Sequence, residues 1–149
     1  MNALDFLKDE HEELKQKIKR LEKASGKTKL KLFEEIKLNA TIHEKAETKF
    51  LYSYLMTKKK YKNHALEHDE EVKIMSRLLR ELNSLTLFSD EWKAKFEVFK
   101  ELTEHHIEEE ENEVFPDLSS LLSHDILDEI GCQILDYKTK YMARKLSKK

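Results

Sequence analysis

Residues 92–116 read WKAKFEVFKELTEHHIEEEENEVFP, and this stretch decides the predicted fold. Large apolar side chains such as Trp92 and Phe96 recur at steps of three and four residues, which is the period of one face of an α-helix. His106 and Glu110 continue this row, at positions that the period otherwise gives to Leu, Ile or Phe. The stretch therefore predicts an amphipathic helix that carries polar groups on its core-facing side.

The same period extends along most of the chain and predicts an all-α protein. The breaks between the apolar rows place the expected helices at about 3–24, 28–58, 61–82, 89–116 and 123–146. Because the connections are short, consecutive helices should pack as antiparallel neighbours. We predict an up-down-up-down antiparallel four-helix bundle over about 3–116. An additional, supporting C-terminal helix over about 123–146 would complete a single domain of residues 1–149.

Composition excludes several classes of protein. With 2 Gly and 1 Pro, the chain has few of the residues that the turns of an all-β protein need. The formal net charge of -2 disfavours nucleic-acid binding. The absence of a long apolar run and the charged pattern that follows Met1 predict neither a membrane span nor a signal peptide, so we expect a cytoplasmic protein. The single cysteine, Cys132, can form neither an internal disulfide nor a thiolate metal cage, and we expect it in the core or at its boundary.

A set of polar residues occupies helix positions that the period reserves for apolar side chains. These candidate metal ligands are His11, His43, Glu47, His64, His68, His106 and Glu110. Burying ionised carboxylates without partners costs several kcal/mol, and a metal cation would compensate for that cost. Residues four apart lie on the same helix face with Cβ atoms about 6 Å apart, so His43 with Glu47, and His106 with Glu110, can ligate one ion or two adjacent ions.

An internal repeat strengthens the prediction of a binuclear site. His43-x3-Glu47-x3-Leu51-Tyr52 matches His106-x3-Glu110-x3-Val114-Phe115. Two similar helix pairs would then face each other across the site, with carboxylates from different helices placed to bridge two ions. Imidazole and carboxylate ligands without thiolate suit iron, manganese or zinc, and ligand type alone does not choose among them.

The chain resembles the hemerythrin-like, or HHE cation-binding, family. That family's pattern is a lone His on the first helix, His-x3-Glu on the second, His-x3-His on the third and His-x4-acid on the fourth, and here the resemblance runs from His11 to about Pro116. It implies two non-heme iron ions with an oxo or hydroxo bridge, manganese and zinc being less expected. By this resemblance, His64, His68 and His106 would hold one iron and His11 and His43 the other, with Glu47 and Glu110 bridging.

The resemblance also implies a function. The iron at His11 and His43 would keep an open position for dioxygen, nitric oxide or peroxide, for storage, delivery or sensing. The first alternative is an enzyme that decomposes peroxide or nitric oxide, or that aids the repair of iron centres. A structural bundle with an incidental zinc ion is the second. The sequence leaves the physiological ligand, the protein partner and the oligomeric state open.

Some positions carry alternatives. The acid on the fourth helix is Glu110 or Glu111; the internal repeat favours Glu110, whereas the family often places this acid five residues after its His. His64 lies close to an expected loop, where a solvated histidine is equally natural.

Phe50 and Tyr54 continue the apolar row of the second helix and are expected in the core.

Overall fold

Helices account for nearly all of residues 1–148, the part of the chain that the computed structural model describes. No strand occurs within these residues, so the prediction of an all-helical bundle is confirmed. Two of the elements, η1 and η2, are single π-helical turns. The elements are α1 (Ala3–Lys23), α2 (Gly26–Glu47), η1 (Thr48–Tyr52), α3 (Ser53–Met56), α4 (Lys62–Ser84), α5 (Asp90–Glu109), η2 (Glu110–Val114), α6 (Phe115–Leu121) and α7 (His124–Ser147).

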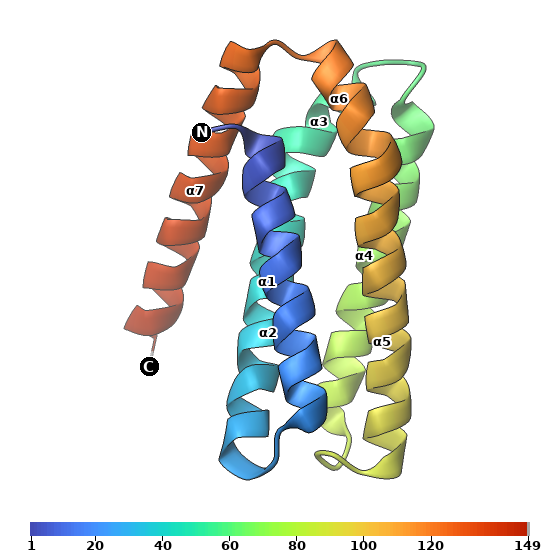
Figure 1. Ribbon diagram of the computed structural model, residues 1–149, viewed down its shortest axis with the longest axis vertical. Coiled ribbons are helices and arrows are strands. Elements are labelled where there is room, and N and C mark those ends of the chain that lie inside the picture. The colour runs from blue at the N-terminus through green and yellow to red at the C-terminus, as the bar shows by residue number, and fades with distance from the viewer. Residues whose placement is uncertain (149) are drawn as a thin grey trace.

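The long helices lie side by side with their axes vertical in Figure 1. α1 runs down from the N-terminus and α2 returns beside it, while α4 runs down and α5 returns in the other half of the molecule. α1 packs mainly against α2, and α4 against α5. α6 leads over the top to α7, which descends along the outside of α1 and α2.

Two helices begin at capping residues that lie at predicted helix starts. The Ser89 hydroxyl accepts the Trp92 N–H at 3.2 Å, and the Ser123 hydroxyl accepts the Ile126 N–H at 3.3 Å, so α5 and α7 begin directly after these residues. The predicted end near Pro116 is wrong. Pro116 lies in the first turn of α6, where a helix does not need its N–H, and the helical path continues to Leu121.

The π-helical turn η1 changes which residues of the second helix face the core. A π turn contains one residue more than an α turn, so the side chains after Glu47 are rotated relative to the predicted row. Leu51, Tyr52 and Leu55 are buried instead. Phe50 is half-buried and Tyr54 is exposed, so the expectation that both lie in the core is wrong.

Two apolar clusters fill the bundle, one above the other. The upper cluster joins the upper ends of the helices to α7, and its members include Leu7, Leu51, Leu55, Phe115, Leu118, Leu127 and Ile130. The lower cluster joins the lower halves of α1, α2, α4 and α5, and its members include Ile18, Phe33, Ile36, Leu82, Trp92 and Phe99. Along α1 the buried His11 stands between Leu7 and Leu14, which belong to different clusters. A polar layer therefore lies between two apolar ones.

The C-terminal helix docks by its first half. Leu127, Ile130 and Ile134 are buried, whereas Cys132 is exposed and Leu146 is 65% exposed. The expectation that Cys132 lies in the core or at its boundary is therefore wrong. None of the helices within residues 1–148 has the length and hydropathy of a membrane-crossing segment.

Gly131 permits the close approach of α7 to the N-terminal segment, because a Cβ atom there would stand 2.1 Å from the Met1 carbonyl oxygen. We expect Gly131→Ala to lower the free energy of unfolding by about 1 to 2 kcal/mol through overpacking. Urea unfolding followed by circular dichroism would measure this loss. Gln133→Ala, on the exposed side of the same helix, should stay within about 0.5 kcal/mol of the parent. Equal stability of the two variants would contradict the prediction.

Candidate metal centre

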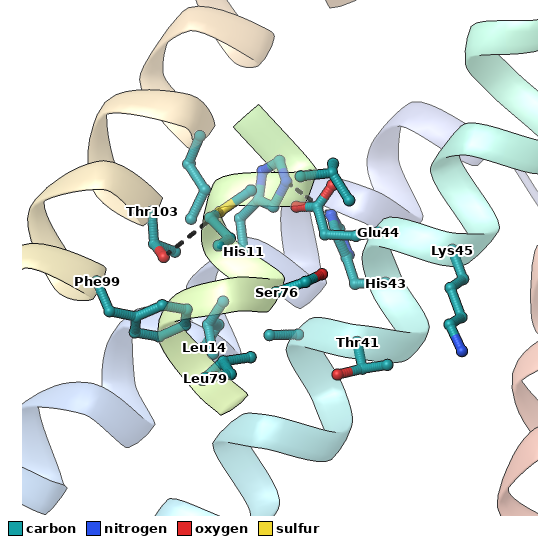
Figure 2. A pocket seen from close by; sticks show the side chains of 14 residues that line it. His11, Leu14, Thr41, His43, Glu44, Lys45, Ser76, Leu79, Phe99 and Thr103 are labelled. Carbon is teal, nitrogen blue, oxygen red and sulfur yellow. Dashed lines mark hydrogen bonds between the residues drawn. The ribbon is translucent and has the colours of Figure 1, made fainter. Parts of the chain in front are cut away.

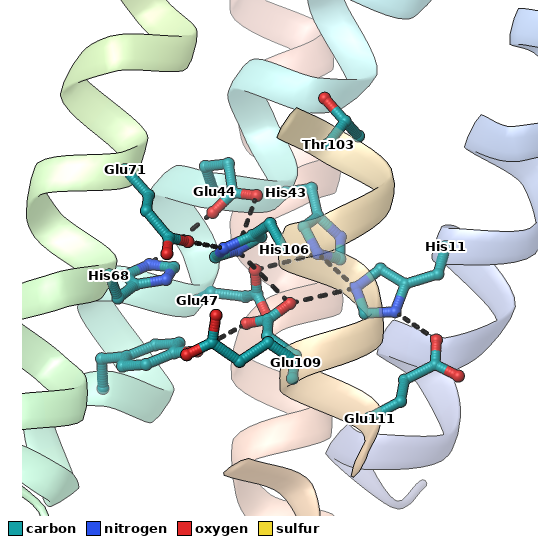
Figure 3. A network of polar contacts seen from close by, with 12 residues as sticks. His11, His43, Glu44, Glu47, His68, Glu71, Thr103, His106, Glu109 and Glu111 are labelled. Atoms are coloured by element: carbon teal, nitrogen blue, oxygen red, sulfur yellow. Dashed lines mark hydrogen bonds and ion pairs between the residues drawn. The ribbon is translucent and has the colours of Figure 1, made fainter. Parts of the chain in front are cut away.

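Imidazoles and carboxylates from four helices converge in the polar layer between the two apolar clusters, as Figure 3 shows. Their side chains are buried or nearly so, and they come from α1, α2, α4 and the junction of α5 with η2. The inner set consists of His11, His43, Glu44, Glu47, His68, His106 and Glu110.

One half of this inner set is formed by His11, His43, Glu47 and Glu110. Each offers a ligand atom, and these atoms lie within 4.8 Å of one another. The Nε2 atoms of His11 and His43 are 3.1 Å apart. Glu47 Oε1 lies 2.9 Å from His43 Nε2, and Glu110 Oε1 lies 3.3 Å from His11 Nε2. A single cation could therefore contact all four residues.

The other half is formed by Glu44, His68 and His106, whose ligand atoms also lie within 4.8 Å of one another. His106 Nε2 is 3.4 Å from Glu44 Oε1, and His68 Nε2 is 3.6 Å from Glu44 Oε2. Glu110 Oε1 is 3.5 Å from His106 Nε2, and the same oxygen is 3.3 Å from His11 Nε2. Glu110 thus lies between the halves, in the place of a bridging ligand.

An outer row of carboxylates fixes the imidazole rings. The Nδ1 atoms of three buried histidines contact carboxylate oxygens, in the pairs His11 with Glu111 at 2.8 Å, His43 with Glu10 at 3.0 Å and His106 with Glu71 at 2.5 Å. Because an ionised carboxylate only accepts hydrogen bonds, each Nδ1 carries the proton. A neutral ring then directs the bare lone pair of Nε2 inward, which is the arrangement of metal-binding histidines in proteins.

This arrangement requires positive charge at its centre. Two Nε2 lone pairs facing each other at the His11–His43 distance of 3.1 Å repel unless a proton or a metal ion lies between them. Both carboxylate oxygens of Glu47, and Oε1 of Glu110, are buried without a hydrogen-bond partner among residues 1–148. His106 Nε2 is in the same situation. These inward-facing acceptors fit metal ions, and a donor set of imidazole and carboxylate suits iron, manganese or zinc.

The pKa shifts of the metal-free centre also indicate that positive charge is needed there. Burial alone would lower the pKa of His106, but the charges of Glu44 and Glu110 raise it to about 12. Burial would also lower the pKa of His43, which Glu47 nevertheless raises well above its usual value. Burial and the charge of Glu110 raise the pKa of Glu47 well above its usual range. Burial would raise the pKa of Glu110 as well, yet His106 holds it well below that range. Protons therefore occupy the place that cations would take.

Aromatic rings cover two of the histidines. Tyr52 stacks on His68 with ring centroids 3.6 Å apart, and its hydroxyl donates to Glu110 Oε2 at 2.7 Å. Phe115 lies parallel to His11 with centroids 5.8 Å apart. Tyr52 and Phe115 are the equivalent last residues of the internal repeat. Each therefore packs on a histidine of a helix outside its own repeat unit.

Most of the predicted ligands meet, but His64 does not join them. The half-buried His64 has a ligand atom within 4.8 Å of those of Glu109 and Glu113, although it lines a small pocket together with His68 and His106. Glu44, which the helical period did not single out, stands beside those two histidines. Its signal in the sequence is its position directly after His43.

The outer carboxylates were also missed, apart from one. Glu10 is adjacent to His11 in the sequence, and Glu71 is three residues after His68, but acidic residues are too common on solvated helix faces for this to be informative. Glu111 was the alternative to Glu110. The structure places Glu110 inside, 1% exposed, and Glu111 on the outer nitrogen of His11.

A largely apolar cavity of about 120 Å³ adjoins the centre on the side of His11 and His43, as Figure 2 shows. Its lining combines these two histidines, Glu44 and Lys45 with mainly small or apolar side chains, including Leu14, Ala40, Val72, Met75, Leu79, Phe99, Thr103 and Ile107. Such a space suits a small neutral molecule better than a charged one.

Comparison with known proteins finds one family. The family model described as Hemerythrin HHE cation binding domain matches residues 2–118. The match contains every residue of the inner set and ends within α6, leaving α7 outside. No curated protein and no solved structure matches the chain. The family resemblance predicted from the ligand spacing is thereby confirmed.

The ligand role of Glu44 can be tested against that of His64. If Glu44 forms a metal site with His68 and His106, Glu44→Ala should weaken metal binding at that site by roughly 10-fold or more, because it removes an inner carboxylate. His64→Ala should leave binding close to that of the parent. Titration of metal-free protein with cobalt(II), followed by ligand-field absorption, measures both stoichiometry and affinity. If His64→Ala weakened metal binding and Glu44→Ala did not, His64 would be the ligand, as the family pattern has it.

Metal binding should also depend on pH. Because the raised pKa values of His43 and His106 keep protons on the metal-free centre near neutral pH, metal ions must displace them, and affinity should fall as the pH falls. Calorimetry of zinc binding in two buffers of different ionisation enthalpy should show roughly one or more protons released per chain. Identical heats in both buffers, with an affinity that does not change with pH, would disprove this account.

Proposed function

Because this chain belongs to the hemerythrin HHE cation-binding family, we propose that it is a non-heme di-iron protein that binds dioxygen or a related small ligand, such as nitric oxide or peroxide. Storage, delivery or sensing of that ligand would be its role. The supporting observation is the convergence of inward-facing imidazole and carboxylate groups from four helices. In this proposal residues 1–149 form one domain, with an up-down-up-down bundle over about 3–116 and a supporting helix over about 123–146.

The two irons would differ in their protein ligands. His11 and His43 would hold the first iron, and His68 and His106 the second, with Glu47 and Glu110 shared between them. The position of Glu44 supports it as the further ligand of the second iron, in the role that the family pattern gives to His64. The first iron would then have fewer protein ligands than the second.

The cavity supports ligand binding at the first iron. It borders His11 and His43, and its volume of about 120 Å³ suits a diatomic molecule and excludes most metabolites. Bound ferrous iron would supply reversible coordination of the ligand and the electrons that stabilise it. The chain's own contribution is to orient the imidazoles through Glu10 and Glu111 and to keep the cavity apolar.

One observation favours the enzymatic alternative, in which the centre decomposes peroxide or nitric oxide. Glu44 adds a third inner carboxylate, and additional carboxylates neutralise more of the metal charge and so favour the oxidised metal. Steady-state turnover of peroxide discriminates between the two functions. Turnover of many equivalents per chain would favour the enzyme, and stoichiometric reaction the binding protein.

Metal identity and ligand binding test the proposal directly. Protein purified from iron-supplemented cells should contain about two iron ions per chain. After anaerobic reduction, addition of nitric oxide or dioxygen should produce charge-transfer absorption in the near ultraviolet and visible. A colourless protein that contains zinc and does not respond would support a structural bundle instead.

A cavity variant tests where the ligand binds. Ala40 lines the cavity and is buried, so Ala40→Leu should fill much of the space and weaken ligand binding by roughly 10-fold or more at unchanged iron content. Ala40→Ser has nearly the size of the parent residue and serves as the matched control. Equal ligand affinity of the two variants would place the ligand elsewhere.

A further inference from the structure

A contact from α7 reaches the metal centre through two residues. Lys138 Nζ on α7 donates to Glu10 Oε2 and forms an ion pair with it. The other oxygen of the same carboxylate, Glu10 Oε1, accepts from His43 Nδ1 at 3.0 Å. The chain of contacts therefore runs from α7 through α1 to an inner histidine of α2.

This contact distinguishes His43 from the other inner histidines. The outer carboxylates Glu71 and Glu111 have no lysine or arginine within ion-pair distance among residues 1–148. Glu10 alone of the three shares its charge with an ammonium group. His43 is thus held by a carboxylate that is itself held in place from a second helix.

The surroundings of Lys138 restrict its movement. Its side chain is 27% exposed and that of Glu10 is 14% exposed, so the pair is only partly accessible to water. The ammonium group also lies 5.7 Å from the centre of the Phe6 ring, a cation–π contact. The buried residues Leu127, Ile130 and Ile134 anchor the first half of α7 against the bundle. The docked helix therefore presents Lys138 at a defined place.

We propose that Lys138 is a positioning residue of the metal centre, which fixes Glu10 and through it the imidazole of His43. This inference rests on the proposed role of His43 as a metal ligand. It makes α7 a functional part of the centre, although the family match ends at residue 118. Without the ammonium group, Glu10 can turn toward water, and the His43 ring loses the partner that holds its Nδ1 proton and its orientation.

The test compares three variants. Lys138→Met removes the charge and keeps the length, Lys138→Arg restores a donor, and Lys140→Met is a matched control in the same helix, because Lys140 is 71% exposed and pairs only with Asp136 among residues 1–148. In metal-free protein, nitrogen-15 NMR of the imidazole groups should show faster exchange of the His43 Nδ1 proton in Lys138→Met alone. The corresponding signals of His11 and His106 should stay unchanged.

Metal retention provides the second measurement. Cobalt-loaded Lys138→Met should lose one ion to a chelator roughly 10-fold faster than the parent, with Lys138→Arg close to the parent. The inference is overturned if Lys138→Met matches Lys140→Met in both the His43 signal and metal retention, or if all histidine signals change equally, as a general loss of packing would cause. A His43-specific NMR effect in a chain that binds no metal would refute the proposed function, while still showing that Lys138 fixes Glu10 and the His43 ring.

Discussion

The structure depends on burying carboxylate oxygens that lack a hydrogen-bond donor among residues 1–148, namely both oxygens of Glu47 and Oε1 of Glu110. Glu47 and Glu110 are 0% and 1% exposed, and the Nε2 atoms of His11, His43 and His106 lie within 3.5 Å of their carboxylate oxygens. A bundle of this size could fill that layer with leucine, as it does above and below, and would gain stability by doing so. Polar residues there need compensating positive charge, from protons or from metal ions, so the four helices meet at a polar centre as well as through apolar packing.

The backbone adapts to this centre at equivalent points. Each helix that carries the His-x3-Glu motif changes to a π-helical turn at or directly after the glutamate, in η1 and η2. The additional residue in each turn brings Tyr52 over His68 and Phe115 over His11. Regular α-helix would direct these aromatic side chains elsewhere. The π turns therefore combine the glutamate and the covering ring on one short segment, a use typical of π turns at functional sites.

The sequence predicted what depends on a single helix face and missed what depends on contacts between helices. His11, His43, Glu47, His68, His106 and Glu110 lie in apolar rows, and the period was sufficient to find them. α2 contacts both α1 and α4, so it presents two faces to the centre, and Glu44 lies on the second of them. A periodic pattern that follows one face of a helix therefore does not include Glu44. The burial of Leu51 and Tyr52 in place of Phe50 and Tyr54 was missed because periodicity assumes a uniform helix, which a π turn interrupts.

The internal repeat relates the two halves of the centre, and the positions where it fails explain why the halves differ. Glu44 directly follows His43, whereas its equivalent after His106 is the buried Ile107, which lines the cavity. Tyr52 adds a hydroxyl bonded to Glu110, and its equivalent, Phe115, has none. Both differences place polar groups beside His68 and apolar ones beside His11. In the proposed assignment, the repeat gives one iron an additional carboxylate, Glu44, and leaves mainly apolar side chains around the cavity beside the other.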